Sequence, residues 1–403
     1  MNLQQKLVVS AIAAIVISTL SPAASSADSL YDAFSQGKVS ADLRARYETV
    51  GQDNAVSDAS AFTVRTRLGY TTADFDGWSF TVEMEDNRIA LGGGDYTVGP
   101  TGYNLGEYSV IADPEFTELD QGFLQYKNEN YTFKIGRQVI ALDGHRFVGH
   151  VGWRQDRQTF DAVTAIFRPS KNFTAQYSYI DQRNRIFGEA ADQDSKDHLL
   201  NISYITDFGK LTAYSYLLEL DSPVDNSLDT YGISFNGKKA IDDIIWLYHL
   251  ELASQSSDTA TSSFDANYVF AELGAQFKSV TAKFGYEVLG SDDGNFGFAT
   301  PLATLHKFNG WSDQFLGTPS QGLKDMYVSV STAGFGGKWL AVMHKFEADS
   351  ATTTVDDLGT ELNLQYTTKF AKHYNVGIKY AGYKGDSGRV DADKVWVWLG
   401  TKF

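Results

Sequence analysis

The sequence predicts an all-β protein: a single transmembrane antiparallel β-barrel of about 16–18 strands, with 18 favoured, a polar lumen and inward-folded loops. Three observations predict this fold. They are a short apolar segment near the N-terminus, an alternation of polar and apolar residues along most of the chain, and a last strand that ends in Phe403. Composition agrees, because aromatic residues make up 14% of the chain and Pro occurs only 7 times. Strands rich in Tyr and Phe and poor in Pro favour a large sheet.

Residues 1–27 have the organisation of a removable secretory signal peptide. Lys6 belongs to a short polar start, residues 7–20 are almost wholly apolar, and the small residues Ser25 and Ala27 occupy the −3 and −1 positions of a cleavage site. The apolar segment is shorter than the roughly 20 residues that a spanning helix needs. We therefore expect cleavage after Ala27 and one domain over residues 28–403, with an N-terminal anchor helix as the alternative.

Strand-like alternation is clearest in the first three expected strands. Their apolar faces carry Val39, Ala41, Leu43, Ala45 and Tyr47, then Phe62, Val64, Leu68 and Tyr70, then Trp78, Phe80, Val82 and Met84. Weaker alternation follows at 173–179, 280–288 and 374–380. A soluble β-sandwich would show the same period. Strands of about ten residues with aromatic residues at their ends favour a barrel in a membrane.

The last ten residues resemble the C-terminal signal that the bacterial barrel-assembly machinery reads. Val395, Val397, Leu399 and Phe403 share one face with Thr401, where an apolar residue is usual, while Trp396 and Trp398 fall on the opposite face and line the lumen or the rim. We therefore expect a protein of the bacterial outer membrane. Its expected partners are the assembly machinery, through Phe403, and the membrane's lipid and lipopolysaccharide.

Charged residues on the polar faces of the first strands are expected to line a water-filled lumen. Basic groups that face lipid at mid-depth cost about 2–4 kcal/mol each. The residues concerned are Arg44, Arg46, Arg65, Arg67, Glu83 and Glu85. Of 13 Arg, 12 lie between Arg44 and Arg185, and planar guanidinium groups suit carboxylate or phosphate. The alternative is that these arginines only balance Asp and Glu in cross-strand ion pairs.

Long connections are expected at 92–113, 139–158, 184–197, 255–266 and 290–324, and two of these regions are candidates for a constriction. The first region, 135–161, concentrates Arg137, Arg146, Trp153, Arg154 and Arg157. The second, 298–316, carries His306, Lys307, Asn309 and Trp311. Aromatic rings next to polar donors can bind sugars. A self-packed external loop is the alternative.

Enzymatic and nucleic-acid functions find little support. The chain has 0 Cys, which excludes disulfides and thiolate chemistry, and its 7 His show no metal-binding spacing. A net charge of −16 disfavours nucleic acid as a partner. Asp161 near His145 and His150 leaves a barrel hydrolase as a remote alternative. We expect no enzyme, no metal and no cofactor.

Motifs in the two candidate constriction regions resemble the alginate-export family of outer-membrane porins. They are Gly136-Arg-Gln, Arg146-Phe-Val-Gly, Val151-Gly-Trp-Arg-Gln, Gln158-Thr-Phe-Asp161 and Thr300-Pro-Leu-Ala-Thr-Leu-His-Lys-Phe-Asn-Gly-Trp311. The strand segments 44–47 and 63–68 also fit, and the resemblance covers about residues 38–403. It implies a barrel of about 18 strands with an arginine-rich lumen for anionic polysaccharide.

The functional hypothesis is a porin for passive diffusion of small anionic or saccharide solutes, with uronate-type oligo- or polysaccharides as one candidate class. A general diffusion porin without marked substrate specificity is the alternative. The sequence leaves open the solute, the direction of flux and the oligomeric state.

Overall fold

The computed structural model describes residues 27–99, 103–224 and 226–403. The expected signal peptide therefore lies outside the described residues, except for Ala27. Within the described ranges, eighteen strands form one antiparallel sheet in which each strand pairs with its neighbours along the chain. β1 (Lys38–Gln52) also pairs with β20 (Ala392–Lys402), which closes the sheet into a barrel. The predicted fold and the favoured strand number are confirmed.

The other barrel strands follow in chain order. They are β2 (Ala59–Thr71), β3 (Trp78–Asp95), β4 (Phe116–Lys127), β5 (Tyr131–Gln138), β6 (Thr159–Phe167), β7 (Phe173–Asn184), β8 (Gln193–Thr206), β9 (Gly209–Leu218), β10 (Asn226–Ile241), β11 (Ile244–Thr259), β12 (Ser263–Phe277), β13 (Val280–Leu289), β16 (Leu323–Gly334), β17 (Gly337–Glu347), β18 (Asp357–Phe370) and β19 (Tyr374–Lys384). The smaller elements are the helix α2 (Leu30–Ser35), the hairpin of β14 (Ser291–Asp292) and β15 (Phe296–Gly297), and the 3-10 turns η2 (Asp143–His145), η3 (Glu189–Ala191) and η4 (Leu305–Lys307).

Alternation places apolar side chains outside the barrel and polar ones inside. In β1, Leu43 and Tyr47 are exposed on the outer surface, whereas Arg46 and Glu48 are buried against other parts of the chain. In β20, Val397 and Leu399 are likewise exposed, and Trp396 is buried in the interior. Exposed apolar residues form the surface that a barrel turns to lipid. The charged residues of the first strands therefore point inward.

The two ends of the barrel differ in the length of their connections. At one end the strands are joined by short turns, at 72–77, 128–130, 168–172, 207–208, 242–243, 278–279, 335–336 and 371–373. At the other end the connections include 96–115, 139–158, 185–192 and 290–322. In bacterial barrels the short turns face the periplasm. The expected long loop at 255–266 is wrong, because β11 and β12 continue their ladder until only residues 260–262 separate them.

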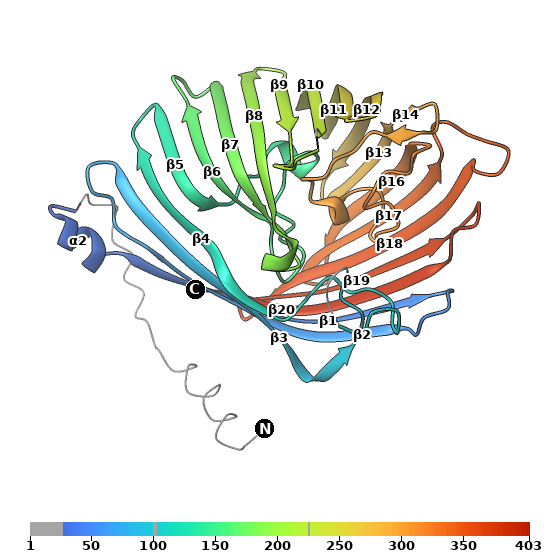
Figure 1. Cartoon of the computed structure of the whole chain (residues 1–403), viewed down its shortest axis with the longest axis horizontal. Helices are drawn as coiled ribbons and strands as arrows, with labels where there is room; N and C mark the ends of the chain where they lie inside the picture. The colour runs from blue at the N-terminus through green and yellow to red at the C-terminus, as the bar shows by residue number, and fades with distance from the viewer. Residues whose placement is uncertain (1–26, 100–102, 225) are drawn as a thin grey trace.

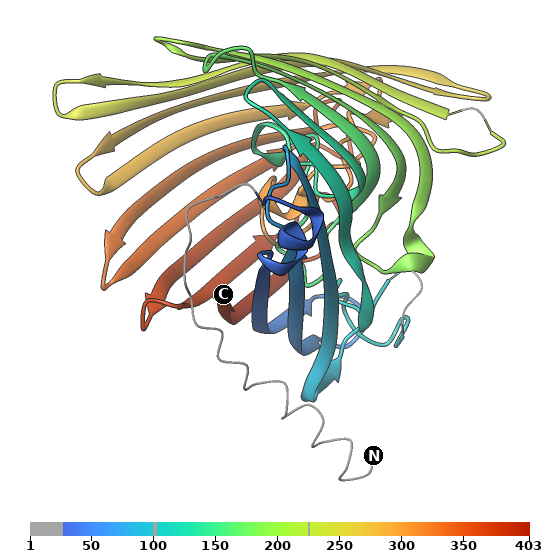
Figure 2. The same cartoon turned by 90° about the vertical axis from the view of Figure 1, so that its left-hand side faces the viewer.

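Two long connections fold back into the barrel. We call residues 139–158 the β5–β6 loop and residues 290–322 the β13–β16 loop, and Figures 1 and 2 show loop segments within the space that the strands enclose. Phe147 and Val148 of the first loop and Phe298 and Leu302 of the second belong to one buried apolar cluster. Burying apolar surface inside the barrel stabilises the inward position of both loops. Among the described residues, no helix has the length and apolarity required to cross a bilayer.

Candidate functional site

The two inward loops pair with each other. Val148 and Leu302 form a parallel bridge, and Gly149 N donates to Leu302 O at 2.8 Å. The side-chain amide of Gln158 donates to both Gly149 O and Leu302 O, at 2.8 and 3.1 Å. A Cβ on Gly149 would lie 2.3 Å from Thr304 Oγ1, so this approach requires glycine. The motifs quoted from both regions therefore meet in one place.

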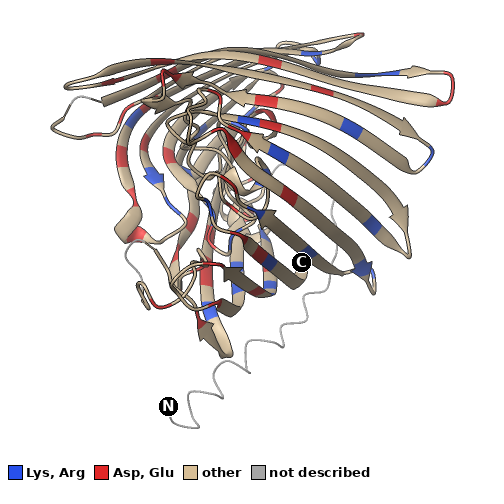
Figure 3. Ribbon diagram, turned by 90° about the vertical axis from the view of Figure 1, so that its right-hand side faces the viewer, with Lys and Arg blue, Asp and Glu red and all other residues tan. Residues whose placement is uncertain are grey.

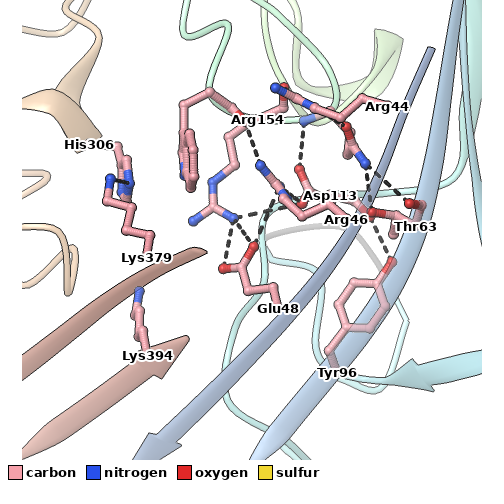
Figure 4. A network of polar contacts seen from close by, with 12 residues as sticks. Arg44, Arg46, Glu48, Thr63, Tyr96, Asp113, Arg154, His306, Lys379 and Lys394 are labelled. Atoms are coloured by element: carbon pink, nitrogen blue, oxygen red, sulfur yellow. Dashed lines mark hydrogen bonds and ion pairs between the residues drawn. The ribbon is translucent and has the colours of Figure 1, made fainter. Parts of the chain in front are cut away.

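Two arginines of β1 hold the β5–β6 loop against the barrel wall (Figure 4). Arg44 donates to Gln155 Oε1 at 2.9 Å, to Gly152 O at 3.1 Å and to Arg154 O. Arg46 donates to Trp153 O at 2.5 Å and forms an ion pair with Asp113. A guanidinium group carries five donors in a fixed fork, which suits it to binding several loop carbonyls at once. Both side chains thus have a positioning role.

Arg154 of the β5–β6 loop links three parts of the structure. Its Nη1 lies 3.0 Å from Glu48 of β1, and its Nη2 lies 3.0 Å from Asp313 of the β13–β16 loop. Asp313 also binds Lys394 of β20 at 2.9 Å. Burial alone would raise the pKa of Asp313, but neighbouring His306, Lys394 and Arg154 hold that pKa well below its usual value. The carboxylate is therefore charged and fastens both loops to the wall.

Next to this network lies an aromatic cluster. Trp153 stacks on His306 with ring centroids 4.8 Å apart and planes 3° apart. The ammonium group of Lys379 lies 3.8 Å from the ring centre of Trp311 and 4.3 Å from that of Trp153. Trp396 packs edge-on against Trp153. The predicted residues Trp153, His306 and Trp311 are therefore brought together, but the faces of Trp153 are occupied by the protein's own side chains.

His306 sits between an anion and a cation. Its Nδ1 lies 2.6 Å from Asp313 Oδ1, and its Nε2 lies 2.8 Å from Lys379 Nζ. A carboxylate can only accept, so the ring proton is on Nδ1, where it donates to Asp313, and Nε2 accepts from Lys379. Burial, reinforced by Lys379, lowers the pKa of His306 to about 3. The histidine is neutral at physiological pH.

A second buried network holds the β13–β16 loop. Arg146 lies 2.6 Å from Glu287 of β13, and Asn309 donates to the other Glu287 oxygen at 2.6 Å. Glu361 of β18 accepts from Ser312 N at 2.9 Å and from Trp311 N. A Cβ on Gly310, which has φ +86°, would lie 2.4 Å from a Glu361 oxygen. Arg146 and Asn309 are thus fully engaged within the protein.

The remaining predicted arginines also form ion pairs with carboxylates. Figure 3 shows charges of both signs interspersed along the strands. The pairs are Arg65 with Asp42 at 2.5 Å, Arg67 with Glu85 at 2.7 Å, Arg157 with Asp120 and Glu83, and Arg137 with Asp161 at 2.8 Å. Arg137 and Arg157 keep 20% and 15% of their side-chain surface exposed, so they reach the lumen more than Arg65 or Arg67. The wall arginines are largely neutralised within the protein.

Several cations that contact the inward loops, among them Arg44, Arg185 and Lys307, form no ion pair with a carboxylate in the described ranges. Arg44 binds the carbonyl and amide oxygens described above, and Arg185 binds Gln158 Oε1 and Pro301 O. Lys307 is exposed at the tip of η4, where its Nζ donates to Gly144 O at 2.7 Å. The hydrogen-bond acceptors of these three side chains are neutral groups, while the carboxylates of Asp113 and Asp192 lie close to Arg44 and Arg185.

A region of the lumen next to Arg185 is acidic, and the backbone N of Arg185 donates to Asp192 there. A cavity of about 270 Å³ is lined by Thr117, Glu118, Leu119, Arg137, Gln182, Glu189 and Asp192. Close to it, both carboxyl oxygens of Asp156 are buried and receive no hydrogen bond from another group. Burial and the neighbouring Glu118 and Glu85 raise the pKa of Asp156 well above its usual value. Its burial therefore favours the protonated form of this carboxyl group, at the end of the β5–β6 loop.

Sequence reasoning missed the loop partners of these residues. Glu48, Glu287 and Lys379 lie on the polar faces of their strands, where alternation predicts an inward position. Asp113 and Asp313 lie in loops and carry no such signal. The proposed hydrolase pairing does not form, because Asp161 binds Arg137 instead of His145 or His150. Among the described residues, no cluster of His, Cys, Asp and Glu is arranged to hold a metal ion.

A closed 18-stranded barrel with an apolar outer surface and a lumen narrowed by paired inward loops is the architecture of a bacterial outer-membrane porin. Residues 36–287 match the protein family described as Alginate export, and the chain belongs to this family. It is therefore a channel of the outer membrane and not an enzyme. The predicted family and location are confirmed.

Solved structures share the fold. Pseudomonas aeruginosa OccK9 (OpdG) is 14% identical, with a TM-score of 0.72 over 92% of this chain and 99% of that chain. Pseudomonas aeruginosa OpdK with vanillate is 13% identical, with a TM-score of 0.71 over 91% and 98%. Acinetobacter baumannii OccAB3 is 13% identical, with a TM-score of 0.70 over 92% and 99%. No curated protein matches the sequence.

Proposed function

We propose that this porin passes small anionic solutes by passive diffusion, with uronate-type oligo- or polysaccharides as one candidate class. The observation that carries the proposal is that Arg44, Arg185 and Lys307, at the inward loops, form no ion pair with a carboxylate of the described residues. Charge of one sign in a narrow, low-dielectric passage raises the local concentration of the opposite ion. The arginines that are paired with carboxylates position the loops that make this passage.

Lys307 is the cation best placed to meet a solute. It is exposed, and only one of its three ammonium donors is used by Gly144 O. The other two remain for a carboxylate. Since Lys307 lies where η4 meets η2 of the other inward loop, a solute that passes the two loops passes this ammonium group.

The test is ion selectivity and solute block in planar bilayers. We expect the reversal potential under a KCl gradient to show anion preference, and current to be blocked by galacturonate oligomers more than by neutral oligomers of the same length. Lys307→Gln should weaken both effects. Lys372→Gln, in an exposed turn at the opposite end of the barrel, is the matched control. Cation preference in the unaltered protein, or no change in Lys307→Gln, would refute the proposal.

A general diffusion porin is the second candidate, and two observations favour it. The wall arginines are paired with carboxylates, and the lumen cavity beside Arg137 is lined by Glu118, Glu189 and Asp192. A lumen of balanced charge would show weak selectivity. This candidate predicts conductance without saturable block by any of the oligomers.

A further inference from the structure

The short helix α2 lies at the short-turn end of the barrel and is joined to the turn between β2 and β3. Ser29 caps its N-terminus, and its one buried residue is Ala33. Ala73 N donates to Ala33 O at 2.9 Å. The turn thus holds the helix at Ala33.

The helix lies on the outer surface of the barrel and not in its mouth. The hydroxyl of Tyr70 donates to Phe34 O. Tyr70 shares the outward face of β2 with Leu68, which is exposed, while Arg67 points into the lumen. Figure 1 shows α2 beside the ends of the strands, next to the turn between β2 and β3.

The surface of α2 divides into three sectors. With about 100° between successive residues, Leu30, Phe34 and Tyr31 fall within an arc of about 100° of the circumference. These side chains are 61%, 51% and 80% exposed. Ala33 faces the barrel, and Asp32 and Ser35 occupy the remaining, polar sector. A helix on the rim of a water-soluble protein would not turn its largest apolar residues away from the protein.

The apolar sector continues the lipid-facing belt of the barrel. Trp78, the first residue of β3, directly follows the turn that holds α2, is exposed on the outer surface and packs on Tyr126 with ring centroids 5.1 Å apart. Aromatic residues at this level mark the boundary between acyl chains and head groups. The apolar sector of α2 therefore lies next to lipid.

We propose that α2 is an interfacial anchor that inserts Leu30, Tyr31 and Phe34 into the phospholipid leaflet at the short-turn end of the barrel. A helix of this length is not stable by itself in water. The barrel rim supports one of its sides, and lipid supports the apolar sector. Asp32 and Ser35 then face the aqueous phase, as the polar side of an interfacial helix does.

The chain contains 0 Cys, so single cysteines can be labelled without altering other positions. Tyr31→Cys reports on the apolar sector, Asp32→Cys on the polar sector, and Leu43→Cys on the lipid-facing wall. Each variant of the full-length protein is spin-labelled and reconstituted in phosphatidylethanolamine–phosphatidylglycerol vesicles. Spin relaxation by oxygen, which concentrates in lipid, is compared with relaxation by a water-soluble nickel chelate.

We expect the Tyr31→Cys label to favour oxygen, as the Leu43→Cys label does, and the Asp32→Cys label to favour the nickel chelate. Equal access of nickel at positions 31 and 32 would overturn the proposal. Dipolar broadening at position 31 that disappears on dilution with unlabelled protein would also overturn it, because a second copy would then cover the helix. A heat-dependent shift in gel mobility, measured for each variant, verifies that the barrel is folded.

Discussion

At the scale of single residues, the barrel interior is organised by carboxylates that bind several partners at once. Glu48 lies 3.0 Å from Arg154 and 3.4 Å from Arg46, and Glu361 accepts three hydrogen bonds from Trp311 and Ser312. A buried charge is costly unless it is paired and hydrogen-bonded. Each of these carboxylates therefore fixes the loop residue that it binds.

Arg154→Ala tests whether buried ion pairs hold the loops, because Arg154 joins β1 to both inward loops. The change leaves Glu48 and Asp313 buried without a shared cation, and loss of one partner of a buried pair costs about 3–5 kcal/mol. We expect the loops to detach, with larger and noisier single-channel conductance, while the barrel stays folded. Arg88→Ala is the control, because Arg88 is 51% exposed and its pair with Asp86 is on the surface. Wild-type conductance in Arg154→Ala would contradict this role.

Acid should loosen the same loops through His306. The pKa of His306 is lowered to about 3 by burial and Lys379, whereas a solvated histidine has a pKa of about 6.5. The detached state therefore binds more protons between these values, so the docked state loses stability as pH falls below about 6.5. Conductance noise measured during a pH titration should rise over that window. In His306→Asn the rise should be smaller, and an identical titration would disprove the assignment.

At the scale of elements, the β5–β6 loop is fastened at both of its edges. Arg44 and Arg46 bind it from β1, and Arg157 binds Asp120 of β4 at 2.8 Å at its far end. Between these points the carboxyl of Asp156 is buried beside Glu118. The loop is thus held by arginines at both of its edges, with a buried carboxyl group between them.

A rise in pH should weaken the docking of the β5–β6 loop at Asp156, because docking buries this carboxyl group and favours its protonated form. The pKa of Asp156 is raised by burial and by Glu118 and Glu85, so the docked loop binds more protons than the detached loop at pH values above about 3.9. Docking is then fully favoured below that value and is lost as pH rises through the raised pKa. Asp156→Asn keeps a neutral side chain and should remove the part of the pH dependence of conductance that comes from this carboxyl group. A variant that keeps the wild-type dependence would exclude Asp156 as its source.

At the scale of the whole molecule, closure depends on the pairing of β1 with β20. The ladder runs from Asp42 opposite Lys402 to Gln52 opposite Ala392. Phe403 extends it through its backbone, since Phe403 N donates to Ala41 O at 2.9 Å, while its side chain is 74% exposed. Closing the sheet removes both edges, so the stability of the barrel depends on the backbone of the last strand.

Phe403→Ala distinguishes a role of this side chain in barrel assembly from a role in the stability of the folded barrel. The exposed ring contributes little to the folded barrel, so the purified variant should unfold at nearly the same temperature as the unaltered protein. If the assembly machinery binds Phe403, the amount of barrel in the outer membrane should fall several-fold. Leu43→Ala, which shortens another exposed side chain on the lipid-facing wall, should not reduce that amount. Equal yields for Phe403→Ala and Leu43→Ala would exclude the recognition role.

Much of the fold could be predicted because alternation is a local property. The inward position of Arg46 and the outward position of Tyr47 follow from the period of two in β1. Loop lengths were harder to predict: residues 255–266 have the polar composition of a loop but continue two paired strands. Pairing with the neighbouring strand determined the structure of this segment, and amino-acid composition does not indicate strand pairing.

The sequence by itself determined the barrel, its family and the two regions that form the constriction, because strand period and motif are written along the chain. Only the tertiary structure decided that Arg46, Asp113 and Arg154 meet, and that Trp153 stacks on His306. These residues are far apart in sequence, so their contacts depend on closure of the barrel and on the inward course of the loops. For the same reason the paired arginines could not be told from the unpaired ones before the fold was known.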